Sequence, residues 1–133
     1  MMFAGKRPNK LGVNDGKLTP CPNTPNCVCS QDSDAGHKIE PLTYNSTAAE
    51  AIANLKQVIQ SMPKTQIITE NTNYLYAEFT SALMGFVDDV EFYLDDVAKV
   101  VHVRSASRLG KSDLGVNRNR IEAIRTKLKE IKS

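Results

Sequence analysis

Four short segments between residues 66 and 105 alternate apolar and polar side chains, and this pattern constrains the fold more than any other feature. Such alternation predicts strands with one buried face. The predicted strands are residues 66–70, 73–81, 87–94 and 99–105. Their apolar members share one face of the expected sheet, namely Leu75, Ala77, Phe79, Val90, Phe92, Leu94, Val101 and Val103.

Two amphipathic segments flank these strands. Thr47 and Glu50 form a capping box, and apolar residues then recur at helical spacing until Pro63, which predicts a helix over residues 47–62. A second apolar stripe, Ile121 to Ile131, predicts a helix over residues 116–131. Two helices can cover the apolar face of such a sheet. The sequence therefore predicts an α+β fold in two layers: a four-stranded antiparallel sheet, two helices packed on one face and an irregular N-terminal arm.

The N-terminal third of the chain is irregular. Residues 1–45 carry five of the six prolines and show little periodicity. We expect residues 1–17 to form a flexible arm and residues 18–133 to form a single domain, since 133 residues suffice for one core.

Composition excludes several classes of protein. The chain has 17 Lys+Arg against 15 Asp+Glu, and a net charge of +2 does not indicate a nucleic-acid partner. No apolar run approaches the roughly 20 residues that span a bilayer, so we expect no transmembrane segment. No apolar stretch follows Lys6 and Arg7, so the N-terminus does not resemble a secretory signal. We expect a soluble, cytoplasmic protein.

The polar face of the sheet offers charged pairs. If residues 95–98 form a hairpin loop, Asp89 lies opposite Arg104 and Glu91 lies opposite His102. The same face would present Tyr74, Tyr76, Glu78, Asp89, Glu91, Tyr93, His102 and Arg104. We favour an ordinary solvated face, and the alternative is a polar pocket beneath the arm.

A basic, glycine-containing stretch connects the last strand to the last helix. Backbone N–H groups and the dipole of a helix N-terminus favour anions there. The turn over residues 104–118 is therefore the leading candidate site, for a small anionic molecule or a protein partner. Its predicted ligand-binding residues are Arg104, Arg108, Asn117 and Arg118. In the competing interpretation, the arginines pair with Asp88 and Asp89, and Asp113 or Asn117 caps the helix.

A small enzyme is the second hypothesis. Here His102 or His37 is the base, Asp89 or Glu91 orients it, and a serine or Cys27 is the nucleophile. No recognised catalytic motif is present. We therefore lean against catalysis and predict no catalytic residue.

A metal site would need separated acids to converge on a histidine. The candidate ligands are Asp88, Asp89 and Asp113 with His37 or His102, and nothing fixes their spacing. We predict no metal and no cofactor.

Three cysteines lie close together at positions 21, 27 and 29. Their spacing does not match a zinc site. Cys21 and Cys27 could join across the intervening Pro-Asn-Thr-Pro-Asn turn, or all three could be small residues in a buried loop. A thiol/disulfide-regulated accessory protein is thus the third hypothesis.

Several motifs together resemble one family. They are the stretches Phe3–Val13, Cys21–Val28, His37–Leu42, Gly85–Tyr93 and Val103–Glu122. They are similar to the family named domain of unknown function 1499, and specifically to its short members, which are typical of cyanobacteria and plastid-bearing organisms. That family reads serine where this chain has Cys29, which leaves Cys21 and Cys27 as the two cysteines of interest. The resemblance implies no activity.

Overall fold

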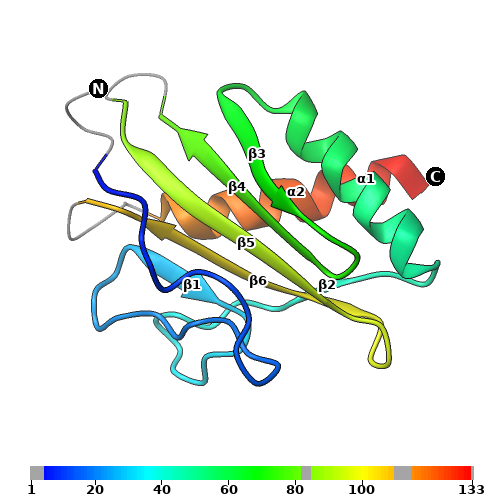
Figure 1. Ribbon diagram of the computed structural model, residues 1–133, viewed down its shortest axis with the longest axis horizontal. Coiled ribbons are helices and arrows are strands. Elements are labelled where there is room, and N and C mark those ends of the chain that lie inside the picture. Colours follow the sequence, from blue (N-terminus) through cyan, green and yellow to red (C-terminus); the bar gives the residue numbers. More distant parts are fainter. Residues whose placement is uncertain (1–4, 82–84, 110–114, 133) are drawn as a thin grey trace.

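Six strands and two helices build the structure, a computed structural model that describes residues 5–81, 85–109 and 115–132. In chain order they are β1 (Cys27–Cys29), β2 (Leu42–Thr43), α1 (Ala48–Ser61), β3 (Thr65–Glu70), β4 (Tyr74–Thr80), β5 (Val87–Asp95), β6 (Val100–Ser107) and α2 (Val116–Lys132). The strands form one mostly antiparallel sheet in the order β1-β6-β5-β4-β3, and β2 also pairs with β6 (Figure 1).

Both helices pack on the same face of the sheet, as predicted. Thr47 is the N-cap of α1, and its hydroxyl accepts the Glu50 N–H at 3.1 Å. The apolar stripes of both helices join the apolar strand residues in one core. Its largest fully buried members are Phe92, Leu42, Leu55, Ile59, Leu75, Ile121 and Ile124. The predicted α+β class is therefore confirmed.

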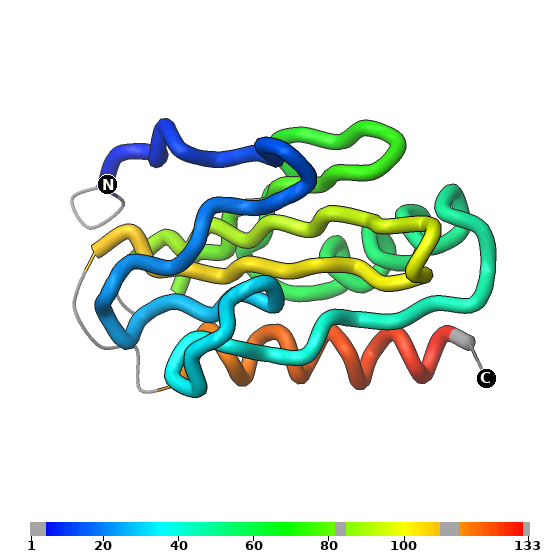
Figure 2. Tube along the Cα trace, turned by 90° about the horizontal axis from the view of Figure 1, so that it is seen from below, coloured from blue at the N-terminus to red at the C-terminus, as the bar shows by residue number. Residues whose placement is uncertain are grey.

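Residues 5–17, which we call the arm, cross the opposite face of the sheet. Figure 2 shows this segment on one side of the strands and α2 on the other. The sheet side chains beneath the arm are buried: Glu91 is 0% exposed and Asp89 is 1% exposed. The prediction of a solvated polar face is wrong, because the N-terminal segment lies over it.

The predicted count of four strands is also wrong. Two further strands come from the segment that the sequence marks as irregular, and both pair with β6. With three and two residues, β1 and β2 are too short to show alternation. They pair the outer edge of β6, which would otherwise present unpaired N–H and C=O groups.

The hairpin between β5 and β6 differs from its predicted register by two residues. Asp95 pairs with Val100, so the loop is residues 96–99 instead of 95–98. The Asp95 carboxylate accepts the N–H groups of Val97 and Ala98, and Lys99 adopts a positive φ of 59°. This turn chemistry sets the register. A shift of two keeps every side chain on its predicted face but changes its partner.

The new partners are Glu91 opposite Arg104 and Tyr93 opposite His102. Asp89 lies opposite Ala106. The predicted pairs of Asp89 with Arg104 and of Glu91 with His102 are therefore wrong.

Candidate functional site

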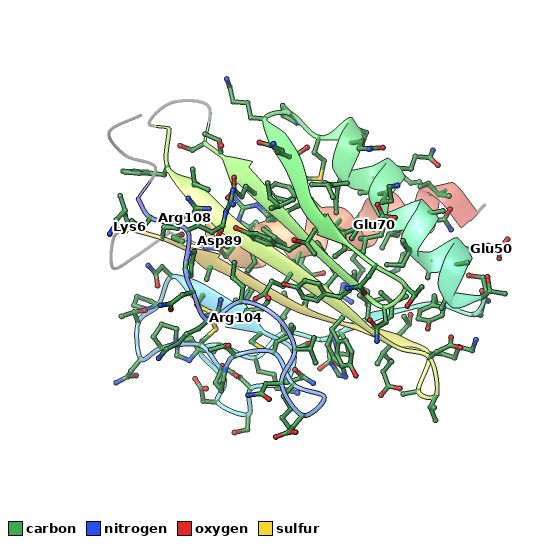
Figure 3. The ribbon with its side chains drawn as sticks, viewed as in Figure 1. Lys6, Glu50, Glu70, Asp89, Arg104 and Arg108 are labelled. Atoms are coloured by element: carbon green, nitrogen blue, oxygen red, sulfur yellow. A yellow bond between two sulfur atoms is a disulfide. The ribbon has the colours of Figure 1, made fainter. Side chains whose placement is uncertain are left out.

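We call the sheet surface beneath the arm the covered face; it carries Tyr74, Tyr76, Glu78, Asp89, Glu91 and Arg104, with Arg108 just beyond β6. Arg108 is its most connected residue. Its Nε and Nη2 donate to the two carboxylate oxygens of Asp89 at 2.9 and 2.8 Å. Nη2 also donates to Glu78, at 2.5 Å. Figure 3 labels Arg108 next to Asp89.

The charges of this cluster are buried, and burying a charge costs free energy unless the charge is paired. The side chains of Arg108 and Asp89 are 7% and 2% exposed. The Tyr76 hydroxyl donates to Asp89 at 2.6 Å, so Asp89 has several donors. The hydrogen bonds that Arg108 donates to Asp89 and Glu78 raise the pKa of Arg108, although burial opposes the rise. Burial and the hydrogen bond to Asp89 raise the pKa of Tyr76. The cluster therefore holds Arg108 as a cation and Tyr76 as a neutral donor.

A second cluster surrounds Glu91. Its Oε2 accepts the Tyr74 hydroxyl at 2.5 Å and the backbone N–H of Gly12, on the arm, at 2.6 Å. Its Oε1 lies 3.9 Å from Arg104 Nη1. Within the described residues, Glu91 Oε1 and Arg104 Nε are buried and have no hydrogen-bond partner. Burial raises the pKa of Glu91, and the bonds from Tyr74 and Gly12 oppose that rise.

Asn117 lies on the other side of the sheet, with the helices. Its Oδ1 accepts Ser105 Oγ and Arg120 Nη1, both at 2.6 Å. Its Nδ2 donates to Ser107 Oγ at 2.9 Å and to the Asn26 carbonyl at 3.2 Å. These hydrogen bonds join α2, β6 and the loop before β1. Asn117 is 0% exposed, so the junction is fully buried.

The predicted ligand-binding residues are thus divided between two faces. Arg104 and Arg108 point to the covered face, and Asn117 points to the helices. Arg118 is half-buried, and its Nη2 donates to the Gly36 carbonyl at 3.4 Å. Asp113 lies outside the described residues, as do all of residues 110–114 of the predicted turn. Binding of an anion at this turn stays a prediction.

A catalytic histidine of the predicted kind needs a hydrogen bond to a carboxylate and another to a nucleophile. Neither histidine forms both with the residues that the structure describes. His102 Nδ1 lies 3.2 Å from Ser30 Oγ, which accepts the Val103 N–H. Its ring stacks on Tyr93, and burial lowers its pKa. Among the described residues, no carboxylate is bonded to His102.

His37 instead bonds to acceptors through both nitrogens. Its Nε2 donates to the Thr24 carbonyl at 2.7 Å and its Nδ1 lies 2.6 Å from Asp34 Oδ2. A neutral ring carries one hydrogen, so both bonds together require the imidazolium. The Thr24 carbonyl and Asp34 accordingly raise the pKa of His37.

The same histidine lies in an acidic cluster. Ligand atoms of Asp32, Asp34 and His37 lie within 4.8 Å of one another. The Asp32 carboxylate accepts the Cys21 N–H at 3.2 Å, and both His37 nitrogens are engaged. A metal would have to displace these bonds, so the geometry favours a structural role for the cluster.

Cys21 and Cys27 are joined by a disulfide, with Cα atoms 5.7 Å apart. Cys27 is 0% exposed in β1, whereas Cys21 is half-buried. The bond closes residues 21–27, which we call the disulfide loop. Cys29 is a free, buried thiol, and burial raises its pKa.

The chain was compared with models of known protein families. The family model described as "protein of unknown function (DUF1499)" matches residues 17–128. The chain belongs to this family. No curated protein matches the chain. In the part of this DUF1499 protein that the structure describes, no helix is sufficiently long and apolar to cross a membrane.

Proposed function

We propose that this DUF1499 protein is a thiol/disulfide-regulated accessory protein in which Cys21 and Cys27 form the switch. The observation that carries the proposal is the position of the disulfide loop. The loop is hydrogen-bonded to β6, to α2 and to the segment after β1. A change in the rigidity of the loop therefore alters its contacts with all three.

The contacts of the loop are specific. The Asn26 carbonyl accepts the Ser107 N–H at 3.0 Å, at the end of β6, and Asn117 Nδ2 of α2. The Thr24 carbonyl accepts His37 Nε2. The loop also continues directly into the buried residues of β1. A loosened loop therefore weakens the pairing of β1 with β6.

The magnitude follows from the length of the loop. Closing a loop of about seven residues lowers the entropy of the open chain by an amount worth about 2.4 kcal/mol at 25 °C, or roughly fiftyfold in an opening equilibrium. That change affects local opening strongly, yet it is smaller than the typical stability of a whole domain, about 5–15 kcal/mol. Reduction is expected to open the loop while the sheet and helices stay folded.

Hydrogen exchange read by mass spectrometry tests this proposal on the full chain. Exchange is compared between the oxidised protein, the reduced protein and Cys29→Ser, which keeps only the Cys21–Cys27 pair. We expect reduction to accelerate exchange in residues 18–30 and to leave α1 and β4 unchanged. Equal exchange of the loop in both redox states would overturn the proposal, as would global unfolding upon reduction.

A further inference from the structure

The arm is a thin cover over a face whose charges are buried. Residues 5–10 are all exposed, and Leu11 and Gly12 are only half-buried. Leu11 packs against the cluster that contains Tyr74 and Tyr76. The arm therefore buries much of the face beneath it while burying little of itself.

Hydrogen bonds near the start and the middle of the arm attach it to the sheet and to Arg108. Arg7 Nε donates to Glu78 Oε2 at 2.7 Å, and the Gly12 N–H donates to Glu91 at 2.6 Å. The Gly5 carbonyl accepts Arg108 Nη1 at 3.5 Å. Because the Arg7 side chain is 52% exposed, its ion pair is screened by solvent. Such a segment is held weakly enough to be displaced.

The arm and the face are complementary in charge. Residues 5–12 contain Lys6, Arg7 and Lys10 and no acid. The strands beneath contribute three carboxylates, Glu78, Asp89 and Glu91, of which Arg104 and Arg108 offset two. The covered face thus favours a basic segment, and the arm is such a segment.

The arm leaves this face incompletely satisfied. Glu91 Oε1 is a buried acceptor that only an ion pair at 3.9 Å from Arg104 Nη1 reaches, and Arg104 Nε is a buried donor. Within the described residues, neither atom has a hydrogen-bond partner. Leaving such groups unpaired is costly. An extended peptide presents an N–H and a C=O at nearly every residue, so a segment that sits deeper than the arm can satisfy both groups.

From these four observations we infer that the covered face is a binding groove for an extended basic segment of a partner protein, and that the arm occupies this groove in cis. The arm displays the pattern that the groove accepts: an arginine for Glu78, a leucine four residues later for the tyrosine cluster, and a free N–H for Glu91. This inference concerns the face itself and does not depend on the redox state of the disulfide.

The test uses the oxidised full chain and a fluorescein-labelled peptide with the sequence of residues 5–13. The variant Arg7→Ala/Leu11→Ala loosens the arm. The matched control, Asn9→Ala, removes an exposed uncharged side chain from the same arm. Fluorescence anisotropy measures binding of the peptide, and circular dichroism verifies that each variant is folded.

We expect the loosened variant to bind the peptide roughly tenfold more tightly than the wild type or the control, because the arm loses an ion pair and an apolar contact. Adding Glu78→Gln to the loosened variant should weaken binding again. A peptide with glutamate in place of its arginine should bind poorly. These three results together would support the groove.

Other results would overturn the inference. One is the absence of binding up to about 1 mM peptide while hydrogen exchange shows residues 5–17 released. Another is unchanged exchange of the arm in the loosened variant, which would mean that the cover is not weakly held. A wild-type dimer that the peptide dissociates would assign the groove to the arm of a second copy instead of a partner protein.

Discussion

Removal of Arg108 should destabilise the fold more than removal of any exposed cation. Arg108→Ala leaves Asp89 and Glu78 without their shared guanidinium, and their side chains are 2% and 14% exposed. Breaking a buried ion pair from one side costs about 3–5 kcal/mol, because the remaining charge stays buried and uncompensated. The loss is a large share of a typical domain's stability of about 5–15 kcal/mol.

Urea denaturation followed by circular dichroism measures this loss. Lys56→Ala is the matched control: Lys56 pairs with Glu70 across 3.1 Å, but these side chains are 34% and 38% exposed. Since exposed pairs contribute about 0–1 kcal/mol and Ala suits a helix, the control should change stability little. A loss below about 1 kcal/mol for Arg108→Ala would refute the reasoning that the covered face depends on its buried ion pairs.

The stability loss of Arg108→Ala should also depend on pH. Burial alone would raise the pKa of Glu78, but hydrogen bonds from Arg7 and Arg108 hold the pKa below its usual value. The stabilisation linked to Glu78 is therefore present above the pKa of the unfolded chain, about 4.3, and is lost as the pH falls through the folded value. The deficit of Arg108→Ala should accordingly be smaller at pH 3 than at pH 7.

Three further predictions concern other parts of the molecule. Asn117→Ala should lower the free energy of unfolding by about 2–3 kcal/mol, because it leaves several buried donors and acceptors unpaired. Substitution of the exposed Asn119 by alanine should change it by only a few tenths of a kcal/mol. Equal effects of the two substitutions in urea titrations would contradict the role of Asn117 in joining α2, β6 and the loop before β1. Stabilisation through the charged form of His37 should be greatest below pH 6.5 and should be lost as the pH rises through the raised folded pKa of His37. The wild type should therefore lose more free energy of unfolding than His37→Gln between pH 5.5 and 8.5. Parallel plots of stability against pH for the two proteins would contradict this prediction. Thiol titration of the oxidised protein should detect Cys29 only after denaturation, and three thiols in denaturant without reductant would contradict the disulfide.

Periodicity predicted the layers of the fold because it extends over many residues. Phe92 lies in a nine-residue strand whose alternate side chains all point to the helices, and Ile124 belongs to a stripe of four apolar residues along α2. Errors of one residue at an end do not change such a pattern. Strands as short as β1 and β2 carry no pattern, so only the pairing partner, β6, defines them.

The residues of the candidate site were harder to predict. Side chains alternate between the two faces along β6, so Arg104 and Ser105, the partner of Asn117, point to opposite faces. The prediction nevertheless placed Arg104 and Asn117 in one site, because it relied on the basic charge of the whole turn. Arg108, just beyond β6, reaches Asp89 of β5, and the register between these two strands depends on the Asp95 turn. Its other acidic partner, Glu78, comes from β4. No local pattern predicts that Arg7 reaches Glu78, 71 residues away. The one available signal was the opposite charge of the two segments, since the arm is basic and the strands are acidic.

The reduction potential of the Cys21–Cys27 pair tests the proposed function most directly. Equilibration of the full-length Cys29→Ser protein in glutathione redox buffers, followed by alkylation and mass spectrometry, gives the potential. A pair that responds to cellular conditions should have a midpoint between about −300 and −200 mV, within the range of glutathione poise. A midpoint well below about −300 mV would identify a permanent structural disulfide and would contradict a thiol/disulfide switch.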